Sequence, residues 1–332
     1  MTAPPQLCVL VLTAGEGSRL RPITASIPKA LCPVGNVPLL DRMLARLARH
    51  GLAGADRVAV NACYLAEQIV AHVAGRAHVS VEVQALGTAG AIAALRPWIA
   101  GRPLLVGNAD AYLAPNGPGL DLERLWTDWD GTTVRLLGVR PTGSQPAEFS
   151  WARFAGFSLL PADVAAAIPA GRTELVSQVW RPAERAGRLE VIEYDGLYLD
   201  TGTPPDYLRA NLHAAGQGSL IAPDAVVTGT VRHSVVGAGA VVRGSLLRSV
   251  ALPGSLVAAG ESLVDAIRVG RDVTVAAHPA VPASRDTTAP PRRDATAPAD
   301  RDATMPAGRD ATVPADRDIV CESPLGPSKE HT

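Results

Sequence analysis

The sequence predicts an α/β fold in which a doubly wound, mostly parallel β-sheet precedes a short left-handed parallel β-helix and a disordered tail. Three observations predict it. Up to about residue 216, apolar strand-like runs alternate with amphipathic helix-like runs. From about Leu220, an aliphatic residue returns every six positions. Further on, an Arg-Asp-Ala-Thr-x-Pro unit repeats in tandem. We therefore expect a catalytic domain over 1–216, a β-helix over 217–277 and a tail over 278–332.

The first 216 residues have the order of elements that is typical of a Rossmann-like domain. Leu39, Leu40, Met43, Leu44 and Leu47 recur at helical spacing, and Gly51 follows as the expected C-cap. Ligands in such sheets bind beyond the carboxyl ends of the strands, so the loop after Leu12 and the region of Asp110 should border one crevice. The other expected strands are 7–12, 57–60, 79–83, 103–106, 133–139 and 154–160, and the other expected helices are 65–73 and 204–214.

The loop after the first strand has the composition of a polyphosphate site. Its small residues, Ala14, Gly15, Gly17 and Ser18, allow backbone N–H groups to approach phosphate oxygens. Arg19, Arg21 and Lys29 supply positive charge. The loop lacks the third glycine of a dinucleotide-binding fingerprint, and Lys29 is too distant for a Walker loop. A triphosphate site of another kind is therefore predicted.

These residues closely resemble the signature of the sugar-1-phosphate nucleotidyltransferases, which reads roughly G-x-G-[ST]-R-L-x-P-x-T and then P-K-x-L-x-P-V. The chain matches with Gly15-Glu-Gly-Ser-Arg-Leu-Arg-Pro-Ile-Thr24 and with Pro28-Lys-Ala-Leu-Cys-Pro-Val34. The resemblance implies that Arg19 and Lys29 are catalytic, acting on the triphosphate and the departing pyrophosphate. It implies that Ala14, Gly15, Gly17 and Ser18 bind the nucleotide. Arg21 fits either a phosphate contact or a solvated side chain.

Three further motifs extend the resemblance. Glu82-Val-Gln-Ala-Leu-Gly-Thr-Ala-Gly90 is similar to the family's E-x-x-x-L-G-T-A-G element, which implies nucleotide contacts from Leu86, Gly87, Thr88 and Gly90. Asp110 and Asp200 match the two aspartates that hold the metal, Mg²⁺, and Gly156 matches a glycine beside the sugar. The family's E-K-P lysine, which meets the sugar phosphate, is missing here, and Arg140 or Arg153 are the candidates to replace it.

The six-residue repeat is similar to that of left-handed β-helices. Copies begin at Ile221, Val227, Val236, Val242 and Leu252, and three hexapeptides per coil give about three coils before residue 276. A plain β-meander is the alternative. In several members of the family such a coil mediates oligomerisation, which implies a homo-oligomer here. The tail has a proline in every repeat and no large aliphatic stripe, so we expect it to be disordered.

Composition excludes several classes of protein. The formal net charge of −1 gives no support to a nucleic-acid partner or an anionic membrane surface. Apolar residues make up 47%, enough for a sizeable core, but no uninterrupted apolar stretch reaches membrane-spanning length. The first residues carry no basic segment of a signal peptide. We therefore expect a cytoplasmic protein.

The predicted reaction joins a nucleoside triphosphate (NTP) and a sugar 1-phosphate into an NDP-sugar with release of pyrophosphate. The L-G-T-A-G element and the coil favour a mannose-1-phosphate guanylyltransferase-like member, using GTP and mannose 1-phosphate. Uridylyl or thymidylyl transfer within the same family is the first alternative. A non-catalytic, nucleotide-sugar-binding regulatory subunit is the second, because the acceptor lysine is missing. A fused β-helix acyltransferase with His233 as its base is the weakest alternative, because the coil is short.

Overall fold

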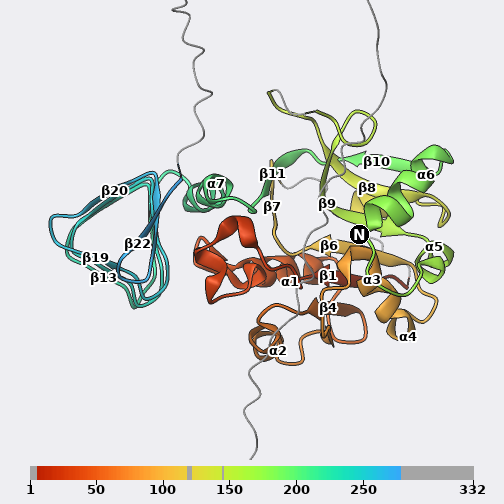
Figure 1. The fold of residues 1–332 in the computed structure, drawn as a ribbon. Coiled ribbons are helices and arrows are strands. Elements are labelled where there is room, and N and C mark those ends of the chain that lie inside the picture. Colours follow the sequence, from red (N-terminus) through yellow and green to blue (C-terminus); the bar gives the residue numbers. More distant parts are fainter. Residues whose placement is uncertain (1–5, 118–121, 144–145, 278–332) are drawn as a thin grey trace, which may run out of the picture.

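The computed structural model describes residues 6–117, 122–143 and 146–277. The segment 278–332, for which we predicted disorder, lies outside the described residues. The described chain forms a central seven-stranded sheet with helices on both faces and a coil of short strands beside it (Figure 1). Its strand order is β10-β8-β9-β6-β1-β4-β5. The strands are β1 (Cys8–Leu12), β4 (Val58–Ala62), β5 (His78–Val81), β6 (Leu104–Asn108), β8 (Val134–Val139), β9 (Arg153–Leu160) and β10 (Leu189–Glu193).

The sheet is mostly parallel, as predicted, with one reversed strand. β1 pairs parallel with both β4 and β6, β4 with β5, and β8 with β10. β9 runs antiparallel to β6 and to β8. The alternation of apolar segments reveals that β9 is a strand but carries no information on its direction, so the sequence did not foresee the reversal.

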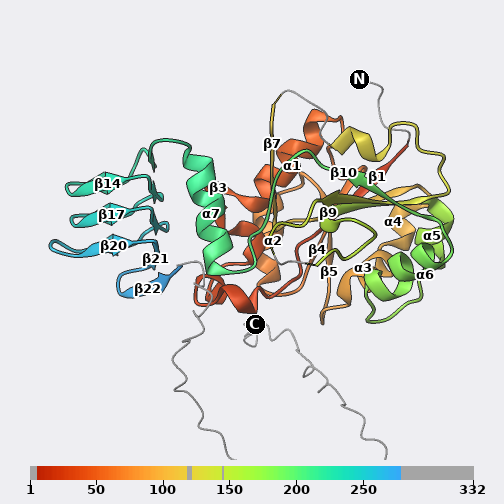
Figure 2. The same cartoon turned by 90° about the horizontal axis from the view of Figure 1, so that it is seen from above.

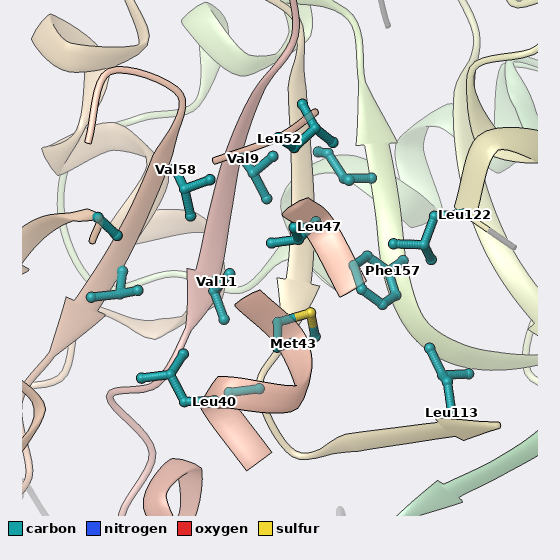
Figure 3. Packing of buried hydrophobic residues seen from close by; sticks show 14 of the residues in the cluster. Val9, Val11, Leu40, Met43, Leu47, Leu52, Val58, Leu113, Leu122 and Phe157 are labelled. Carbon is teal, nitrogen blue, oxygen red and sulfur yellow. The ribbon is translucent and has the colours of Figure 1, made fainter. Parts of the chain in front are cut away.

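Two layers of helices cover the sheet, because alternate side chains of each strand point to opposite faces. Val9 and Val11 of β1 pack with Leu40, Met43 and Leu47 on one face (Figure 3). The other face packs against α3 and the elements that follow β9. The helices are α1 (Leu39–Arg49), α2 (Ala66–Val73), α3 (Gly87–Ala94), α4 (Arg96–Ile99), α5 (Ala162–Ala167) and α6 (Arg181–Arg185), with a π-helical segment at Val176–Trp180. No described helix is long and apolar enough to cross a membrane.

A second, two-stranded sheet extends from the carboxyl end of β6. β7 (Ala111–Pro115) follows Asp110 directly and pairs antiparallel with β11 (Gly196–Asp200). A short hairpin, β2 (Pro33–Val34) and β3 (Val37–Pro38), precedes α1. The 3₁₀ turns are Ser18–Leu20, Ile23–Ala25, Lys29–Leu31 and Leu122–Leu125. The β7–β11 pair was not predicted, and it brings together two segments that lie far apart in the sequence.

Helix α7 (Pro204–Ala215) connects the part of the chain that contains the central sheet to the coil (Figure 2). It begins at the N-cap Thr203, whose hydroxyl accepts a hydrogen bond from the Asp206 N–H. Its buried Tyr207 packs in one cluster with Val235 and Val250 of the coil. The Tyr207 hydroxyl also donates a hydrogen bond to the Pro33 carbonyl oxygen in β2. The helix predicted over 204–214 is therefore confirmed, and it contacts both parts of the chain.

The coil consists of three ladders of very short strands. Each strand pairs in parallel with the third strand along the chain, whereas a meander pairs consecutive strands antiparallel. The ladders form the sides of a triangle in Figure 1. They are β12-β15-β18-β21, β13-β16-β19 and β14-β17-β20, built from β12 (Leu220–Ile221), β13 (Val226–Val227), β14 (Thr230–Arg232), β15 (Val235–Val236), β16 (Val241–Val242), β17 (Ser245–Leu247), β18 (Val250–Ala251), β19 (Leu256–Val257), β20 (Ser262–Val264) and β21 (Ala266–Val269). β22 (Val273–Ala276) pairs antiparallel with β21 and ends the coil.

The coil repeat is shorter than predicted. Three hexapeptides would give about 18 residues per coil, but Ser219 and Ser234 occupy equivalent places in successive coils 15 residues apart. A later step spans 17 residues. The reason lies at the corner between β16 and β17, where an added Cβ at Gly244 would lie 2.2 Å from the Glu261 carbonyl oxygen. Only two residues separate β16 from β17 at this corner, whereas four separate β19 from β20, so the regular six-residue prediction was wrong there.

Candidate active site

Four charged residues from distant parts of the chain meet at one place. The Lys29 ammonium donates a hydrogen bond to Asp110 Oδ2 and lies 3.5 Å from Asp200 Oδ1. Arg19 Nη2 lies 3.7 Å from Asp200 Oδ2. Lys29 is the most enclosed of the four, with 11% of its side chain exposed. The two cations and two carboxylates predicted from separate motifs are thus neighbours.

The position of Lys29 is fixed by the glycine loop. Lys29 begins a 3₁₀ turn directly after the extended residue Pro28, and the aliphatic part of its side chain lies against Gly17. Gly17 has φ +66°, and an added Cβ there would lie 3.1 Å from Lys29 Cβ and 3.0 Å from Thr24 Cγ2. Any other residue at 17 would be strained in this left-handed conformation and would crowd the lysine. Gly17 therefore supports the lysine as well as the loop.

The loop itself offers backbone donors. Within the described residues, the N–H groups of Ala14, Gly15, Glu16 and Gly17 donate no hydrogen bond to a protein acceptor. An added Cβ at Gly15 would meet nothing within 4 Å, so this part of the loop borders open space. Successive unpaired N–H groups form a concave anion site. The predicted nucleotide residues of this loop thus lie where phosphate oxygens could reach the backbone.

The β7–β11 pair explains why Asp110 and Asp200 lie together. Asp200 pairs with Ala111, the residue after Asp110. Thr201 then donates two hydrogen bonds to the Asp110 carbonyl oxygen, from its N–H at 3.3 Å and from its hydroxyl at 2.9 Å. Gly202 completes the arrangement, because an added Cβ would lie 2.9 Å from Arg19 Nη2 and 3.2 Å from Lys29 Nζ. Thr201 and Gly202 are site residues that our sequence analysis missed, although both directly follow Asp200 in the chain.

A hollow of about 320 Å³ opens beside this cluster. It combines Lys29 and Asp110 with the glycine loop and with residues from β4, from the segment after β5 and from α3. The lining residues are Leu12, Thr13, Ala14, Gly15, Lys29, Ala30, Asn61, Glu82, Ala85, Gly87, Thr88, Asn108, Ala109, Asp110 and Glu174. Gly17, Ser18, Leu86 and Gly90 were predicted to bind the nucleotide but do not line this hollow.

The first turn of α3 is already hydrogen-bonded within the protein. The N–H and hydroxyl of Thr88 donate to Glu174 Oε2 at 3.1 and 2.7 Å. The N–H groups of Ala89 and Gly90 donate to the Thr173 carbonyl oxygen. An added Cβ at Gly90 would lie 2.4 Å from the Gly171 carbonyl oxygen. Gly90 therefore allows the segment 171–174 to close over α3, which is a packing role that the motif did not suggest.

Asn61 and Glu82 form a buried polar pair in the wall of the hollow. Asn61 Nδ2 donates to Glu82 Oε1 at 2.8 Å, and the Leu86 N–H donates to Glu82 Oε2 at 3.0 Å. Asn61 Oδ1 accepts from the Thr13 N–H at 2.9 Å. Burial raises the pKa of Glu82 above its ordinary value, although both hydrogen bonds act in the opposite direction. Neither residue was among our predicted site residues, although Glu82 is the first residue of the E-x-x-x-L-G-T-A-G element.

Comparison with known proteins identifies the first part of this arrangement. Residues 8–118, which carry the glycine loop, Lys29, Glu82 and Asp110, match the protein-family model described as Nucleotidyl transferase. Residues 8–118 are a nucleotidyl transferase domain. The predicted family resemblance is confirmed.

Named relatives extend over most of this nucleotidyl transferase. It is 28% identical over 246 residues to the N-acetylmuramate alpha-1-phosphate uridylyltransferase of Caulobacter vibrioides, covering 65% of this chain and 99% of that protein. It is 27% identical over 277 residues to the mannose-1-phosphate guanylyltransferase of Mycobacterium tuberculosis, covering 74% of each. The crystal structure of HddC from Yersinia pseudotuberculosis, complexed with GMP-PN, shares the fold at 21% identity and a TM-score of 0.50, over 61% of this chain and 97% of that one.

A second group of residues lies next to the two aspartates. Gly156 of β9 has φ +83°, and an added Cβ would lie 2.4 Å from Ala111 Cβ and 3.8 Å from the Tyr198 ring. Burial raises the pKa of the Tyr198 hydroxyl, and the negative charges of Asp200 and Asp110 raise it further. Gly156, predicted to contact the sugar, therefore lies beside the residue that follows Asp110.

The two arginines considered for the missing lysine differ in their surroundings. Arg153 donates to Glu148 at 3.4 Å, and its charge lowers the pKa of Tyr198. Arg140 pairs with Glu193 at 2.7 Å, with 74% of its side chain exposed. Arg153 is thus the one whose charge acts on the neighbourhood of the aspartates.

The two carboxylates of the cluster suit a metal ion that takes most of its ligands from water and substrate. Among the residues that the structure describes, no three His, Cys, Asp or Glu side chains gather to hold a metal. Asp110 and Asp200 nevertheless direct oxygens to one cation, the Lys29 ammonium. Mg²⁺ commonly takes only one or two protein carboxylates and completes its shell with water and substrate phosphates. Asp110 and Asp200 therefore fit the part of such a shell that a protein supplies.

Proposed function

We propose that this nucleotidyl transferase joins a nucleoside triphosphate and a sugar 1-phosphate, giving an NDP-sugar and pyrophosphate. The observation that carries the proposal is the meeting of Arg19, Lys29, Asp110 and Asp200 beside one hollow. An oxygen of the sugar phosphate attacks the α-phosphorus, and the bond between that phosphorus and the oxygen bridging to the β-phosphate breaks. The nucleophile is already an anion, so no general base is needed. The barrier comes from bringing two polyanions together, which positioning and charge neutralisation lower.

Each residue has a proposed part in that neutralisation. Unpaired N–H groups from Ala14 to Gly17 bind phosphate oxygens, and Arg19 and Lys29 meet the triphosphate and the leaving pyrophosphate. Asp110 and Asp200 would hold Mg²⁺, which would supply positive charge between the two substrates. Gly156 leaves space for the sugar. A preorganised cation of this kind stabilises the transition state by about 3 kcal/mol.

For the base we propose guanine, with mannose 1-phosphate as the acceptor. Two carboxylates, Glu82 and Glu174, line the hollow, and the amide of Asn61 is occupied by Thr13 and Glu82. The wall therefore presents hydrogen-bond acceptors. Guanine carries adjacent N1–H and N2–H donors, whereas uracil carries one donor between two acceptors. The match to the guanylyltransferase of M. tuberculosis covers 74% of the chain, more than the 65% covered by the uridylyltransferase of C. vibrioides.

Uridylyl transfer is the second candidate. It is favoured by the C. vibrioides relative, 99% of whose length aligns with this chain at 28% identity. The experiment is a pyrophosphate-release assay with Mg²⁺ over a matrix of GTP, UTP, dTTP and ATP against mannose, glucose and N-acetylmuramate 1-phosphates. We expect release with GTP and mannose 1-phosphate that is lost in Lys29→Ala and Asp110→Ala. Release only with UTP would contradict guanylyl transfer and support uridylyl transfer. Nucleotide binding without release from any pair would support a regulatory subunit.

We further propose that the coil is a left-handed β-helix and that it joins copies of the chain. Val226 pairs with Val241 and Val241 with Leu256, and their chain neighbours Val227 and Val242 pack inside the coil. The three aliphatic side chains should therefore form an outward ladder, and 53% of Val226 is exposed. Light scattering after gel filtration tests this, since Val226→Asp with Val241→Asp should lower the mass to that of a monomer. His233, the base of the acyltransferase alternative, lies exposed at a coil corner with φ +46°.

A further inference from the structure

Lys29 stands out within a chain that scarcely uses lysine. Among 31 lysine and arginine residues, only Lys29 and Lys329 are lysines. Arginine therefore serves nearly everywhere else that positive charge is needed. An ammonium is a compact point charge that several oxygens can surround, whereas a guanidinium is a planar fork. The lysine stands where two carboxylates, those of Asp110 and Asp200, converge on one cation.

The contacts of the ammonium are those of a bound cation. Lys29 Nζ donates to Asp110 Oδ2 and lies 3.5 Å from Asp200 Oδ1. Its side chain is 11% exposed, against 31% for Asp110 and 45% for Asp200. Arg19 reaches only the other oxygen of Asp200, at 3.7 Å, and is 70% exposed. The ammonium alone is therefore shared between the two carboxylates.

We infer that the Lys29 ammonium occupies, in the nucleotide-free protein, the position between Asp110 and Asp200 that a divalent cation takes when the nucleotide is bound. The inference rests on the proposed function for its second half, because that function gives Lys29 the triphosphate as an alternative partner. The ammonium and the metal compete for the same two carboxylates. The protein without nucleotide therefore binds metal weakly, and the phosphates must draw the lysine away first.

A coupling between nucleotide and metal follows. Phosphates that pair with Lys29 release Asp110 and Asp200 and add oxygen ligands of their own. Each ligand therefore raises the affinity for the other by the same factor. The arrangement also keeps the carboxylate pair neutralised in the absence of substrate, since Lys29 and Arg19 together balance the charge of Asp110 and Asp200.

The first test measures Mn²⁺ binding without nucleotide, using the electron paramagnetic resonance signal of free Mn²⁺. Lys29→Met removes the competing charge and should bind Mn²⁺ about tenfold or more tightly than the unmodified protein. Lys29→Met with Asp110→Asn should lose that gain. Arg248→Met is the matched control, because it removes the cation from the ion pair between Arg248 and Asp265 in the coil. Equal affinity in Lys29→Met and the unmodified protein would overturn the inference.

The second test follows the lysine in the unmodified chain, so it does not depend on any variant folding. Lysine labelled with ¹⁵N at Nζ gives signals from Lys29 and Lys329 alone, and Lys329→Arg assigns them. Mg²⁺ alone should leave the Lys29 signal in place, whereas Mg²⁺ with a non-hydrolysable GTP or UTP analogue should shift it. A shift of equal size with Mg²⁺ alone would contradict the required order. Neither experiment measures turnover, so their failure is distinguishable from failure of the proposed reaction.

Discussion

The hydroxyl of Thr201 donates a hydrogen bond of 2.9 Å to the Asp110 carbonyl oxygen and so ties the two halves of the carboxylate pair together. Thr201 is fully buried, and a second bond from its N–H to the same oxygen is longer, at 3.3 Å. Asp110 follows β6 and Asp200 ends β11, which are separated by β7, β8, β9 and β10 along the chain. The position of Asp110 relative to Asp200 therefore depends on this local contact.

Thr201→Val tests that dependence, because valine keeps the shape and removes only the donor. We expect the free energy of unfolding to fall by about 1 kcal/mol, the usual net contribution of one hydrogen bond. Pyrophosphate release should fall about tenfold, since the aspartates lose their fixed separation. Thr228→Val makes the same change at an exposed position of the coil and should leave both quantities unchanged. Full activity in Thr201→Val would show that the pairing of β7 with β11 suffices.

Gly202→Ala should inactivate the protein with little loss of stability. The added Cβ would lie 2.9 Å from both Arg19 Nη2 and Asp200 Oδ1. These atoms end flexible side chains, so the chain can fold by moving them, but the cluster is then disrupted. We expect pyrophosphate release to fall about a hundredfold, as when one preorganised charge contact is lost. The control is Gly218→Ala, where an added Cβ meets nothing within 4 Å. Thermal unfolding of both variants separates a folding defect from a site defect.

Much of this site could be predicted because its residues lie in contiguous motifs. The motifs indicate Arg19, Lys29, Asp110 and Asp200, and these four residues lie together. What the sequence could not supply is the contacts between motifs. Thr173 contacts α3 through its backbone carbonyl group, which any residue would offer, and Glu174 contacts it through a carboxylate 86 residues away from Thr88 in the sequence.

The same limit applies to the fold. Alternating apolar segments located six of the seven strands of the central sheet and both α1 and α7, but they missed β10. The antiparallel direction of β9 depends on how the chain returns after β8, and the coil repeat depends on how tightly Gly244 packs against Glu261. Both are properties of tertiary packing. Periodicity identifies which residues face inward but does not count the residues at a corner.

Glu82→Gln should weaken discrimination between GTP and UTP. Glu82 is 5% exposed and accepts from both Asn61 Nδ2 and the Leu86 N–H. Glutamine keeps the size but replaces one acceptor oxygen with a donor, which matches a carbonyl of uracil better than a donor of guanine. We expect the ratio of kcat/KM for GTP over UTP to fall about tenfold, the effect of about 1.4 kcal/mol. Asp272→Asn, an exposed change in the coil, is the control. An unchanged ratio would place the base away from Glu82.

Asp41 should make stability depend on pH at the acidic end. Burial opposes its ionisation, but hydrogen bonds from Arg76 at 2.8 Å and His72 at 2.9 Å outweigh burial and hold the pKa of Asp41 below 3.8. A carboxyl group whose pKa is lower in the folded than in the unfolded protein stabilises the fold above the unfolded-state pKa. This stabilisation is lost as the pH falls through the folded-state pKa. Asp41→Asn should therefore cost about 1 kcal/mol near pH 7 and nothing below both values. Denaturant unfolding measured from neutral to strongly acidic pH checks this, and a difference that persists in acid would refute it.

Arg19 and Arg21 offer a matched pair of substitutions two residues apart. Arg19 Nη2 lies 3.7 Å from Asp200 Oδ2, inside the cluster, whereas Arg21 pairs with Glu16 on the outside of the loop. Both side chains are at least half exposed, at 70% and 51%, so neither truncation should unfold the chain. Arg19→Ala should lower kcat/KM for the nucleotide about a hundredfold, because it removes a cation from the developing pyrophosphate. Arg21→Ala should stay within about threefold of the unmodified protein, the effect of a surface ion pair. Steady-state kinetics on both variants decides whether proximity to Asp200 or positive charge in the loop as a whole determines the rate. An equal fall in kcat/KM in the two variants would indicate that the positive charge of the loop as a whole matters and that Arg21 also contacts phosphate.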